Sequence, residues 1–331
     1  MDLLKNVNAV RHDQPWAGCH VLTFDVEEWF HARNLGVDRM RWSGFPSRLD
    51  KPIDTILALL AEHETHATFF VLGWVARRSP DLVRRIHRAG HEIASHGYGH
   101  RPIYEQTPAQ FREDIHKSKS LLEEIIGTRV LGYRAPSYSI GPETDWALDI
   151  LQDAGFAYDS SIYPTRAPHG RYGMPGTPLH PYRIRAGLWE FPLPTWRVLG
   201  WRVPAATGAY LRLAPLIVTR LAVNQNVRRG IPVVINLHPW ELDPAQPRSA
   251  APRWKRFLHY ANLHTTQRKL ASLLGMYHFV RACDLWRQCE PRPVSKPRRE
   301  IIGSASGDGM RVRDPRRRQD ESAPAASSTS R

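Results

Sequence analysis

Two acidic side chains stand two residues apart at the end of an apolar segment. The segment LeuThrPheAspValGluGluTrpPhe (22–30) contains Asp25 and Glu27. Side chains alternate between the two faces of a β-strand, so both carboxylates would point to one face. A solvated strand end is the structural alternative. Because α/β folds place their chemistry at the C-terminal ends of strands, the position favours a functional acid pair.

Two histidines follow another apolar segment. His96 and His100 are four residues apart in SerHisGlyTyrGlyHis (95–100). Two neutral imidazoles at this spacing can bind one cation if the backbone turns helically after His96. Gly97 and Gly99 make a loop equally possible, and surface or capping roles are the alternative for either histidine.

Two single basic residues occupy comparable positions. Arg134 ends the segment 130–134 and precedes AlaPro, where an arginine commonly pairs with a carboxylate or an anionic substrate. His238 ends the apolar segment 231–238. A surface arginine and a structural histidine are the alternatives when each residue is taken alone.

The elements that must position these groups alternate between strand and helix. Expected strands lie at 67–72, 91–96, 130–134, 156–160 and 231–238, and expected helices at 52–65, 79–90, 107–127 and 142–154. Regular alternation with short connections predicts parallel βαβ units, in either an open doubly wound sheet or a barrel. In both arrangements the acid pair, the histidine pair, Arg134 and His238 converge on one rim of the sheet, which independent structural accidents would not be expected to do.

The rest of the chain carries weaker signals. Residues 170–215 resemble long loops, with one clear strand at 188–191, and residues 253–286 have helical spacing of leucines. The segment 291–331 has few large apolar residues, so its composition predicts a disordered basic tail. We therefore expect an N-terminal extension (1–20), one domain (21–290) and the tail (291–331).

The composition limits the class of metal site. The chain has 331 residues, 42% of them hydrophobic, which is enough for the core of one large α/β domain or two modest ones. Its cysteines (Cys19, Cys283 and Cys289) are too few and too scattered for a disulfide framework or a cysteine-rich zinc site. Any metal must then be held by histidines and carboxylates.

The net charge of +14 raises the question of partners. The tail holds ten Lys or Arg against five Asp or Glu, which leaves about +9 over the first 290 residues. No nucleic-acid-binding signature accompanies the charge, so we expect no nucleic acid partner and consider anionic glycans or peripheral membrane association instead. The sequence has no signal-peptide core and no apolar stretch of about 18 residues. We expect a cytoplasmic protein, with the inner membrane face as an option; the oligomeric state is open.

These motifs together resemble the NodB-like polysaccharide deacetylases. The resemblance runs in order from about Val21 to Trp240 and rests on ThrPheAsp (23–25), HisGlyTyrGlyHis (96–100), ArgAlaPro (134–136) and LeuHis (237–238). Further segments are similar to the subgroup encoded with exosortase and exopolysaccharide loci: AspValGluGluTrpPhe (25–30), TyrAspSerSerIleTyrPro (158–164), HisProTrpGluLeuAsp (238–243) and PheLeuHisTyrAlaAsnLeu (257–263). The resemblance implies a distorted (β/α) barrel of about seven units.

The resemblance also implies roles for individual residues. The family's catalytic base falls on Asp25, its orienting arginine on Arg134 and its general acid on His238, which we expect on the rim opposite Asp25. Its histidine ligands fall on His96 and His100. These roles imply metal-dependent removal of acetyl groups from an N-acetylated polysaccharide or glycan.

The first motif departs from the family pattern. Many members have two adjacent aspartates there, and the second binds the metal, whereas position 26 of this chain is valine. Glu27 is the candidate for the missing ligand, and a divalent cation, with Zn²⁺ favoured, is the expected cofactor. The departure keeps two alternatives open: an inactive glycan-binding homologue, and a hydrolase of another amide or an O-acetyl ester.

Three residues are expected to contact the substrate. The backbone N–H of Ser137 would help to hold the developing oxyanion. The aromatic side chains of Tyr138 and Trp240 are expected to stack on sugar rings.

Overall fold

A computed structural model describes residues 16, 18–165 and 173–290. The sequence-based predictions of an N-terminal extension and of a disordered tail therefore fall almost entirely outside the described residues. Within those ranges, no helix is long and apolar enough to cross a lipid bilayer.

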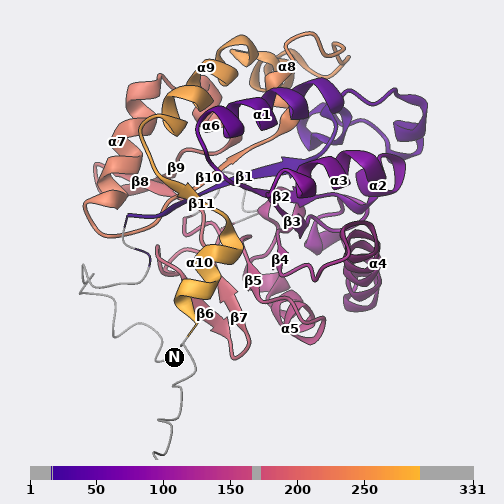
Figure 1. Ribbon diagram of the computed structural model, residues 1–331, viewed down its shortest axis with the longest axis horizontal. Helices are drawn as coiled ribbons and strands as arrows, with labels where there is room; N and C mark the ends of the chain where they lie inside the picture. The colour runs from indigo at the N-terminus through magenta and orange to yellow at the C-terminus, as the bar shows by residue number, and fades with distance from the viewer. Residues whose placement is uncertain (1–15, 17, 166–172, 291–331) are drawn as a thin grey trace, which may run out of the picture. The chain divides into compact units, whose positions relative to one another are not determined.

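A nine-stranded sheet runs through the described part of the chain, in the order β10-β1-β2-β3-β4-β5-β7-β6, with β11 also paired to β1 (Figure 1). All neighbours are parallel except the pair β6–β7. The strands are β1 (His20–Val26), β2 (Thr68–Val71), β3 (Glu92–Ser95), β4 (Gly132–Tyr133), β5 (Tyr158–Asp159), β6 (Tyr182–Arg185), β7 (Leu188–Glu190), β10 (Val234–Leu237) and β11 (Phe279–Val280). The α/β barrel-like fold is confirmed, although no described strand pair joins β10 to β6 and closes the ring.

Helices follow the parallel strands, and most of them cover the outer side of the sheet (Figure 1), whereas the last helix packs against inner-face residues such as Val21 and Phe70. They are α1 (Asp50–Glu62), α2 (Gly73–Arg78), α3 (Pro80–Arg88), α4 (Pro108–Ile126), α5 (Trp146–Asp153), α6 (Gly208–Leu213), α7 (Leu216–Val227), α8 (Arg253–Tyr260), α9 (Leu263–Leu274) and α10 (Ala282–Cys289). The ends of α4 follow from the sequence: Thr107 and Gln110 form a capping box, and Gly127 ends the helix with φ +72°.

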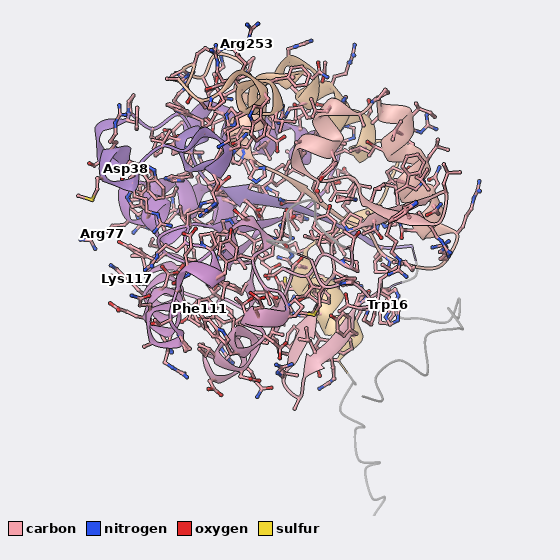
Figure 2. All side chains as sticks on the ribbon, turned by 180° about the vertical axis from the view of Figure 1, so that it is seen from behind. Trp16, Asp38, Arg77, Phe111, Lys117 and Arg253 are labelled. Carbon is pink, nitrogen blue, oxygen red and sulfur yellow. The ribbon has the colours of Figure 1, made fainter. Side chains whose placement is uncertain are left out.

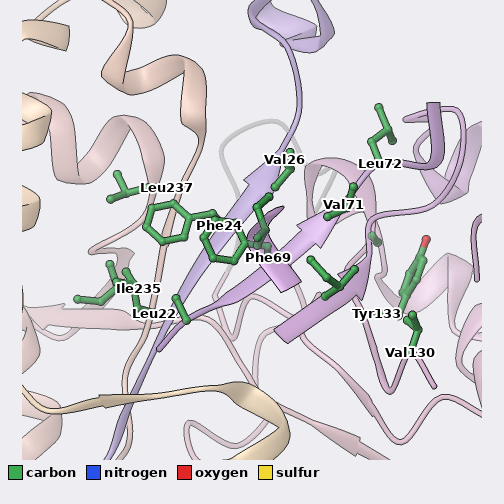
Figure 3. Packing of buried hydrophobic residues seen from close by; sticks show 14 of the residues in the cluster. Leu22, Phe24, Val26, Phe69, Val71, Leu72, Val130, Tyr133, Ile235 and Leu237 are labelled. Atoms are coloured by element: carbon green, nitrogen blue, oxygen red, sulfur yellow. The ribbon is translucent and has the colours of Figure 1, made fainter. Parts of the chain in front are cut away.

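The alternation of side chains on β1 divides the core from the site. Leu22, Phe24 and Val26 point outward into the main hydrophobic cluster, where Phe24 stacks on Phe69 of β2 (Figure 3). The intervening residues point to the inner face of the sheet. Asp25 therefore shares a face with Thr23, while Val26 belongs to the core and is fully buried.

Two regions contain more structure than the sequence patterns predict. In the predicted loop region 170–215, the described residues from 173 onward form β6, the hairpin of β8 (Thr195–Val198) and β9 (Trp201–Pro204), and α6, in addition to the expected β7. Residues 253–286 are three helices with β11 between the last two, because the chain turns at Asn262 with φ +58° and leaves the helix after Gly275. Short edge strands and a single turn residue carry little periodic signal.

Candidate active site

A cavity of about 380 Å³ lies where β1, β3 and β10 end. Eight of the nine predicted site residues line it: Asp25, Glu27, His96, His100, Ser137, Tyr138, His238 and Trp240. The ninth, Arg134, is fully buried behind the cavity wall. Parallel strands that end at one edge thus bring distant parts of the sequence together, as the convergence argument predicts.

Glu27, His96 and His100 form the one group of potential metal ligands found among the described residues. Their ligand atoms all lie within 4.8 Å of one another, and the three side chains are buried. His96 Nδ1 donates to the carbonyl oxygen of Arg134 at 2.9 Å, which leaves Nε2 without a proton and free to bind a cation. Burial lowers the pKa of His96 to about 4, so the imidazole is neutral at pH 7.

A loop, rather than a helical turn, carries the histidine pair. Gly97 has φ +73° and His100 has φ +50°. The Asp114 carboxylate on α4 accepts hydrogen bonds from the backbone N–H groups of Tyr98 and Gly99 at 2.7 and 3.0 Å. Asp114 therefore holds the loop in the shape that turns both imidazoles toward Glu27.

Glu27 is a buried carboxylate beside two of the histidines. Its Oε1 atom accepts a hydrogen bond from Trp240 Nε1 at 3.2 Å. Its buried Oε2 atom accepts none, although His100 Nε2 faces it at 2.7 Å. Burial would raise the pKa of Glu27, but His100 and the neighbouring His238 hold that pKa well below its usual range, so the carboxylate is charged. A buried carboxylate next to two imidazoles is a ligand set that suits a divalent cation.

Glu28, the acidic residue that follows Glu27, has a different environment. Glu28 points away from this group, and its carboxylate oxygens accept the backbone N–H of Arg48 at 3.2 Å. The strand alternation predicted for Asp25 and Glu27 thus also separates Glu27 from Glu28.

Asp25 is held by two neighbours in the centre of the site. Its Oδ1 accepts from Arg134 Nη1 and its Oδ2 accepts from Asn236 Nδ2, both at 2.9 Å. Burial would raise the pKa of Asp25, but Arg134, together with His96 and His238, lowers that pKa below its ordinary value. The carboxylate is therefore ionised and fixed in orientation.

Arg134 is itself fully constrained. Its Nε donates to the Ser160 carbonyl and its Nη2 to the Ser160 hydroxyl, both at 2.9 Å, while Nη1 also donates to Thr23 and Asn236. The guanidinium lies 4.1 Å from the centre of the Phe70 ring. This network leaves Arg134 to orient Asp25 rather than to bind a ligand directly.

His238 is paired with a carboxylate that the sequence analysis did not single out. His238 Nδ1 donates to Glu241 Oε1 at 2.7 Å, and Glu241 Oε2 accepts from Arg212 Nε at 3.0 Å. Burial would lower the pKa of His238, but Glu241 and Glu27 raise it to about 9. The imidazole is therefore protonated near pH 7.

The predicted place of His238 is wrong in one respect. His238 Nε2 lies 3.8 Å from Asp25 Oδ2 and 3.5 Å from Glu27 Oε1, not across the cavity from them. The reason is the strand order, because β10 pairs directly with β1.

Trp240 is only 8% exposed, so it offers little of its ring for the expected stacking on a sugar. Its ring stacks on His238 at 5.1 Å and on His259 at 4.2 Å. Tyr138 lines the cavity and accepts a hydrogen bond from Asn236 Nδ2 at 2.7 Å. Ser137 and Tyr138 have positive φ angles of 56° and 54°, which turn this segment into the cavity wall.

Residues 19–158 match the family described as polysaccharide deacetylase, and residues 160–287 match one described as a domain of unknown function, DUF3473. Residues 19–158 are therefore a polysaccharide deacetylase domain. A peptidoglycan deacetylase of Helicobacter pylori is 30% identical over 110 residues, 33% of this chain and 36% of the relative. A chitooligosaccharide deacetylase of Sinorhizobium fredii is 34% identical over 112 residues, 33% of this chain and 48% of the relative.

A solved structure supports the fold. A Mycobacterium smegmatis protein, provisionally named a polysaccharide deacetylase, superposes with a TM-score of 0.56 at 20% identity, covering 85% of this chain and 96% of that one. The matches to curated relatives are shorter and span only about a quarter to a half of the relatives' lengths. The resemblance inferred from the motifs is confirmed at the level of the family.

The two matched regions contribute strands to one sheet. β5 ends the first region, β7 in the second region pairs with β5, and β10 pairs with β1 at the start of the first. The site is divided accordingly. Asp25, the predicted ligands and Arg134 come from the first region, and His238 comes from the second.

Proposed function

We propose that the protein is a metal-dependent hydrolase that removes acetyl groups from an N-acetylated polysaccharide or glycan, in exopolysaccharide or cell-envelope synthesis. The observation that carries the proposal is the meeting of three kinds of group in one cavity: an ionised carboxylate (Asp25), a protonated imidazole (His238) and a set of ligand atoms for a cation. A general base, a general acid and a bound cation are the functions that metal-assisted hydrolysis of an amide uses.

Glu27, His96 and His100 would hold the metal, and Zn²⁺ suits two imidazoles with one carboxylate. When bound, such a cation polarises an acyl carbonyl and lowers the pKa of a coordinated water. Trp240 Nε1 fixes the Glu27 carboxylate and the Arg134 carbonyl fixes the His96 ring, so the ligands are oriented by their neighbours.

Asp25 is the proposed general base. Arg134 and Asn236 each engage one carboxylate oxygen, which holds the carboxylate toward the cavity and keeps it ionised until it takes a proton from the attacking water.

His238 is the proposed general acid. Glu241 accepts the hydrogen bond from Nδ1 of His238 and keeps the imidazole positively charged. Nε2–H of His238 therefore faces the cavity as the proton donor. An amine leaves poorly unless it is protonated, and His238 Nε2 is the group that would deliver that proton to the sugar nitrogen. The backbone at Ser137 borders the same cavity and is a candidate for holding the oxyanion.

The decisive experiment is acetate release by the zinc-loaded full chain from a panel of N-acetylated oligosaccharides, including chitin oligomers and peptidoglycan strands. We expect release from at least one substrate, loss of release on chelation with recovery on adding Zn²⁺, and loss in Asp25→Asn. A protein that binds the metal and a glycan but releases no acetate would be a glycan-binding homologue. Release from small cyclic amides or aryl esters alone would point to a different hydrolase.

A further inference from the structure

Helix α8 presents an apolar stripe to solvent. Trp254, Phe257 and Leu258 are 62%, 64% and 37% exposed, respectively. The spacing of three and four residues places their side chains on one side of the helix. His259 and Tyr260 are the buried residues of the helix. α8 is therefore an amphipathic helix that turns part of its apolar surface outward, whereas a surface helix usually turns that surface toward the core.

Positive charge surrounds this stripe. Arg248, Arg253 and Arg256 line a surface hollow together with Trp254, Phe257 and Tyr260. Within the described residues none of these three arginines forms an ion pair with a carboxylate, and α8 itself contains no acidic residue. Figure 2 shows Arg253 at the outer edge of the ribbon. The side of α8 that carries the aromatic residues thus has an unbalanced positive charge.

The helix also borders the active site. Leu258 lines the cavity that contains the predicted ligands. Arg212 donates to the carbonyl oxygens of Leu258 and Ala261 at 2.7 and 2.6 Å, and the same guanidinium bonds Glu241, the partner of His238. The end of α8 is therefore fixed to the residues that hold the proposed general acid.

We propose that α8 docks the protein on an anionic phospholipid surface, with Trp254, Phe257 and Leu258 in the interfacial layer and the arginines on lipid phosphates. An exposed stripe of Trp, Phe and Leu flanked by Arg and Lys is the composition of helices that lie in a membrane interface. A soluble acidic glycan would use the arginines and the aromatic rings, but it offers no apolar counterpart to Leu258. Charge complementarity and the apolar stripe together favour the lipid surface.

If α8 docks on a membrane, the active site lies close to the lipid surface, which suggests a class of substrate. This suggestion rests on the proposed function. The active-site cavity shares Leu258 with the docking stripe, so its opening would lie beside the lipid headgroups. The sugar part of a glycan that is still attached to a lipid carrier would lie at the same height above the membrane as this opening. Membrane docking through α8 can be tested without measuring hydrolysis.

The test is sedimentation of the full chain with vesicles of phosphatidylcholine alone or mixed with phosphatidylglycerol. We expect binding to the mixed vesicles only, and about a tenfold or greater loss of affinity in Trp254→Ser/Phe257→Ser and in Arg253→Ala/Arg256→Ala. Trp201→Ser is the matched apolar control, since Trp201 on β9 is 77% exposed. Arg77→Ala/Arg88→Ala is the matched charge control, and Figure 2 places Arg77 well away from Arg253. Both controls should bind as the unchanged chain does.

Three outcomes would overturn the proposal. One is the absence of binding to mixed vesicles, and a second is binding that the α8 variants do not weaken more than the controls do. In the third, the unchanged chain does not bind vesicles but binds a soluble polyuronate or forms a dimer in sedimentation velocity. The variant Trp254→Ser/Phe257→Ser then loses that binding or that dimer. That result would assign α8 to a glycan or to a second copy. Acetate release from soluble oligosaccharides, measured in parallel, keeps a failure of docking separate from a failure of the proposed activity.

Discussion

At the scale of single residues, Glu27 and Glu28 provide a matched pair of neighbouring carboxylates. Glu27→Gln removes the charge that faces His100, so the purified variant should lose its metal. Glu28→Gln should keep its metal, because Glu28 accepts the backbone N–H of Arg48 and faces away from the ligands. Elemental analysis after dialysis measures the metal content. Loss of metal from the Glu28 variant with retention in the Glu27 variant would reverse the ligand assignment.

His238 allows a test that separates proton donation from metal binding. His238→Ala should keep its fold and metal yet lose about two to four orders of magnitude in rate, the usual effect of losing a positioned proton donor. The loss should be larger for N-acetyl substrates than for aryl acetates, whose phenolate leaves without protonation. Kinetics on both substrates, with metal analysis, check this. Equal losses on the two substrates would remove the acid role.

The sequence predicted those site residues that lie at the ends of strands. Asp25, His96, Arg134 and His238 stand at or next to strand ends, and periodicity locates those ends. Asn236, Glu241 and Asp114 were missed because their importance depends on which side chains they meet. Asn236 bridges Asp25 and Arg134 only because β10 pairs with β1 in one register. Spacing within one strand does not reveal its partner.

At the scale of elements, two buried histidines tie strands to their surroundings. His20 Nδ1 accepts the backbone N–H of Val233, and His91 Nδ1 accepts that of Ala67, so each ring must be unprotonated at that atom. Burial lowers the pKa of both histidines to about 4 from an ordinary value of 6.5. Their contribution to stability is therefore present above pH 6.5 and is lost as the pH falls toward 4. For each histidine the loss is at most about 1.4 kcal/mol per pH unit.

Urea unfolding of His20→Gln measures one of these contributions. The glutamine carbonyl can still accept a hydrogen bond and does not titrate, so the free energy of unfolding should fall less steeply between pH 6.5 and 4 than in the unchanged chain. An identical slope in both proteins would show that His20 is not responsible.

Gly132 on β4 tests the packing between neighbouring strands. A Cβ atom there would overlap the ring of Tyr158 on β5, whose hydroxyl donates to Glu92. Gly132→Ala should lower the free energy of unfolding by about 1–3 kcal/mol. Gly44→Ala is the control, since nothing lies within 4 Å of its added methyl group, and it should stay within about 0.5 kcal/mol. Similar values for the two variants in urea unfolding would contradict the packing argument.

Elements with long periodic segments or clear caps were predictable, as α1 and α4 illustrate. The hairpin β8–β9 and strand β11 were not. β11 has only two residues, and it exists because Phe279 and Val280 pair with the start of β1 more than 250 residues earlier in the sequence. Such long-range pairing leaves no local pattern.

At the scale of the whole molecule, the sequence predicts that residues 291–331 are dispensable for folding and turnover. A truncation after Glu290 keeps the contacts of Glu290 with Trp189 and Arg183. Its melting temperature and acetate release should match those of the full chain. A melting temperature several degrees lower, measured by thermal denaturation, would contradict the prediction.

The position of β1 between β2 and β10 also determines when its neighbours become available during synthesis. β1 is complete at Val26, but the strand on its other side begins only at Val234. At about 5–20 residues per second, roughly 200 residues take about ten to forty seconds to emerge from a ribosome. Throughout that interval an apolar strand edge stays open to other chains, which is an aggregation hazard that chaperones commonly cover. The proposed general acid also emerges after the base and the ligands, so the nascent chain acquires its complete site only once His238 has been synthesised.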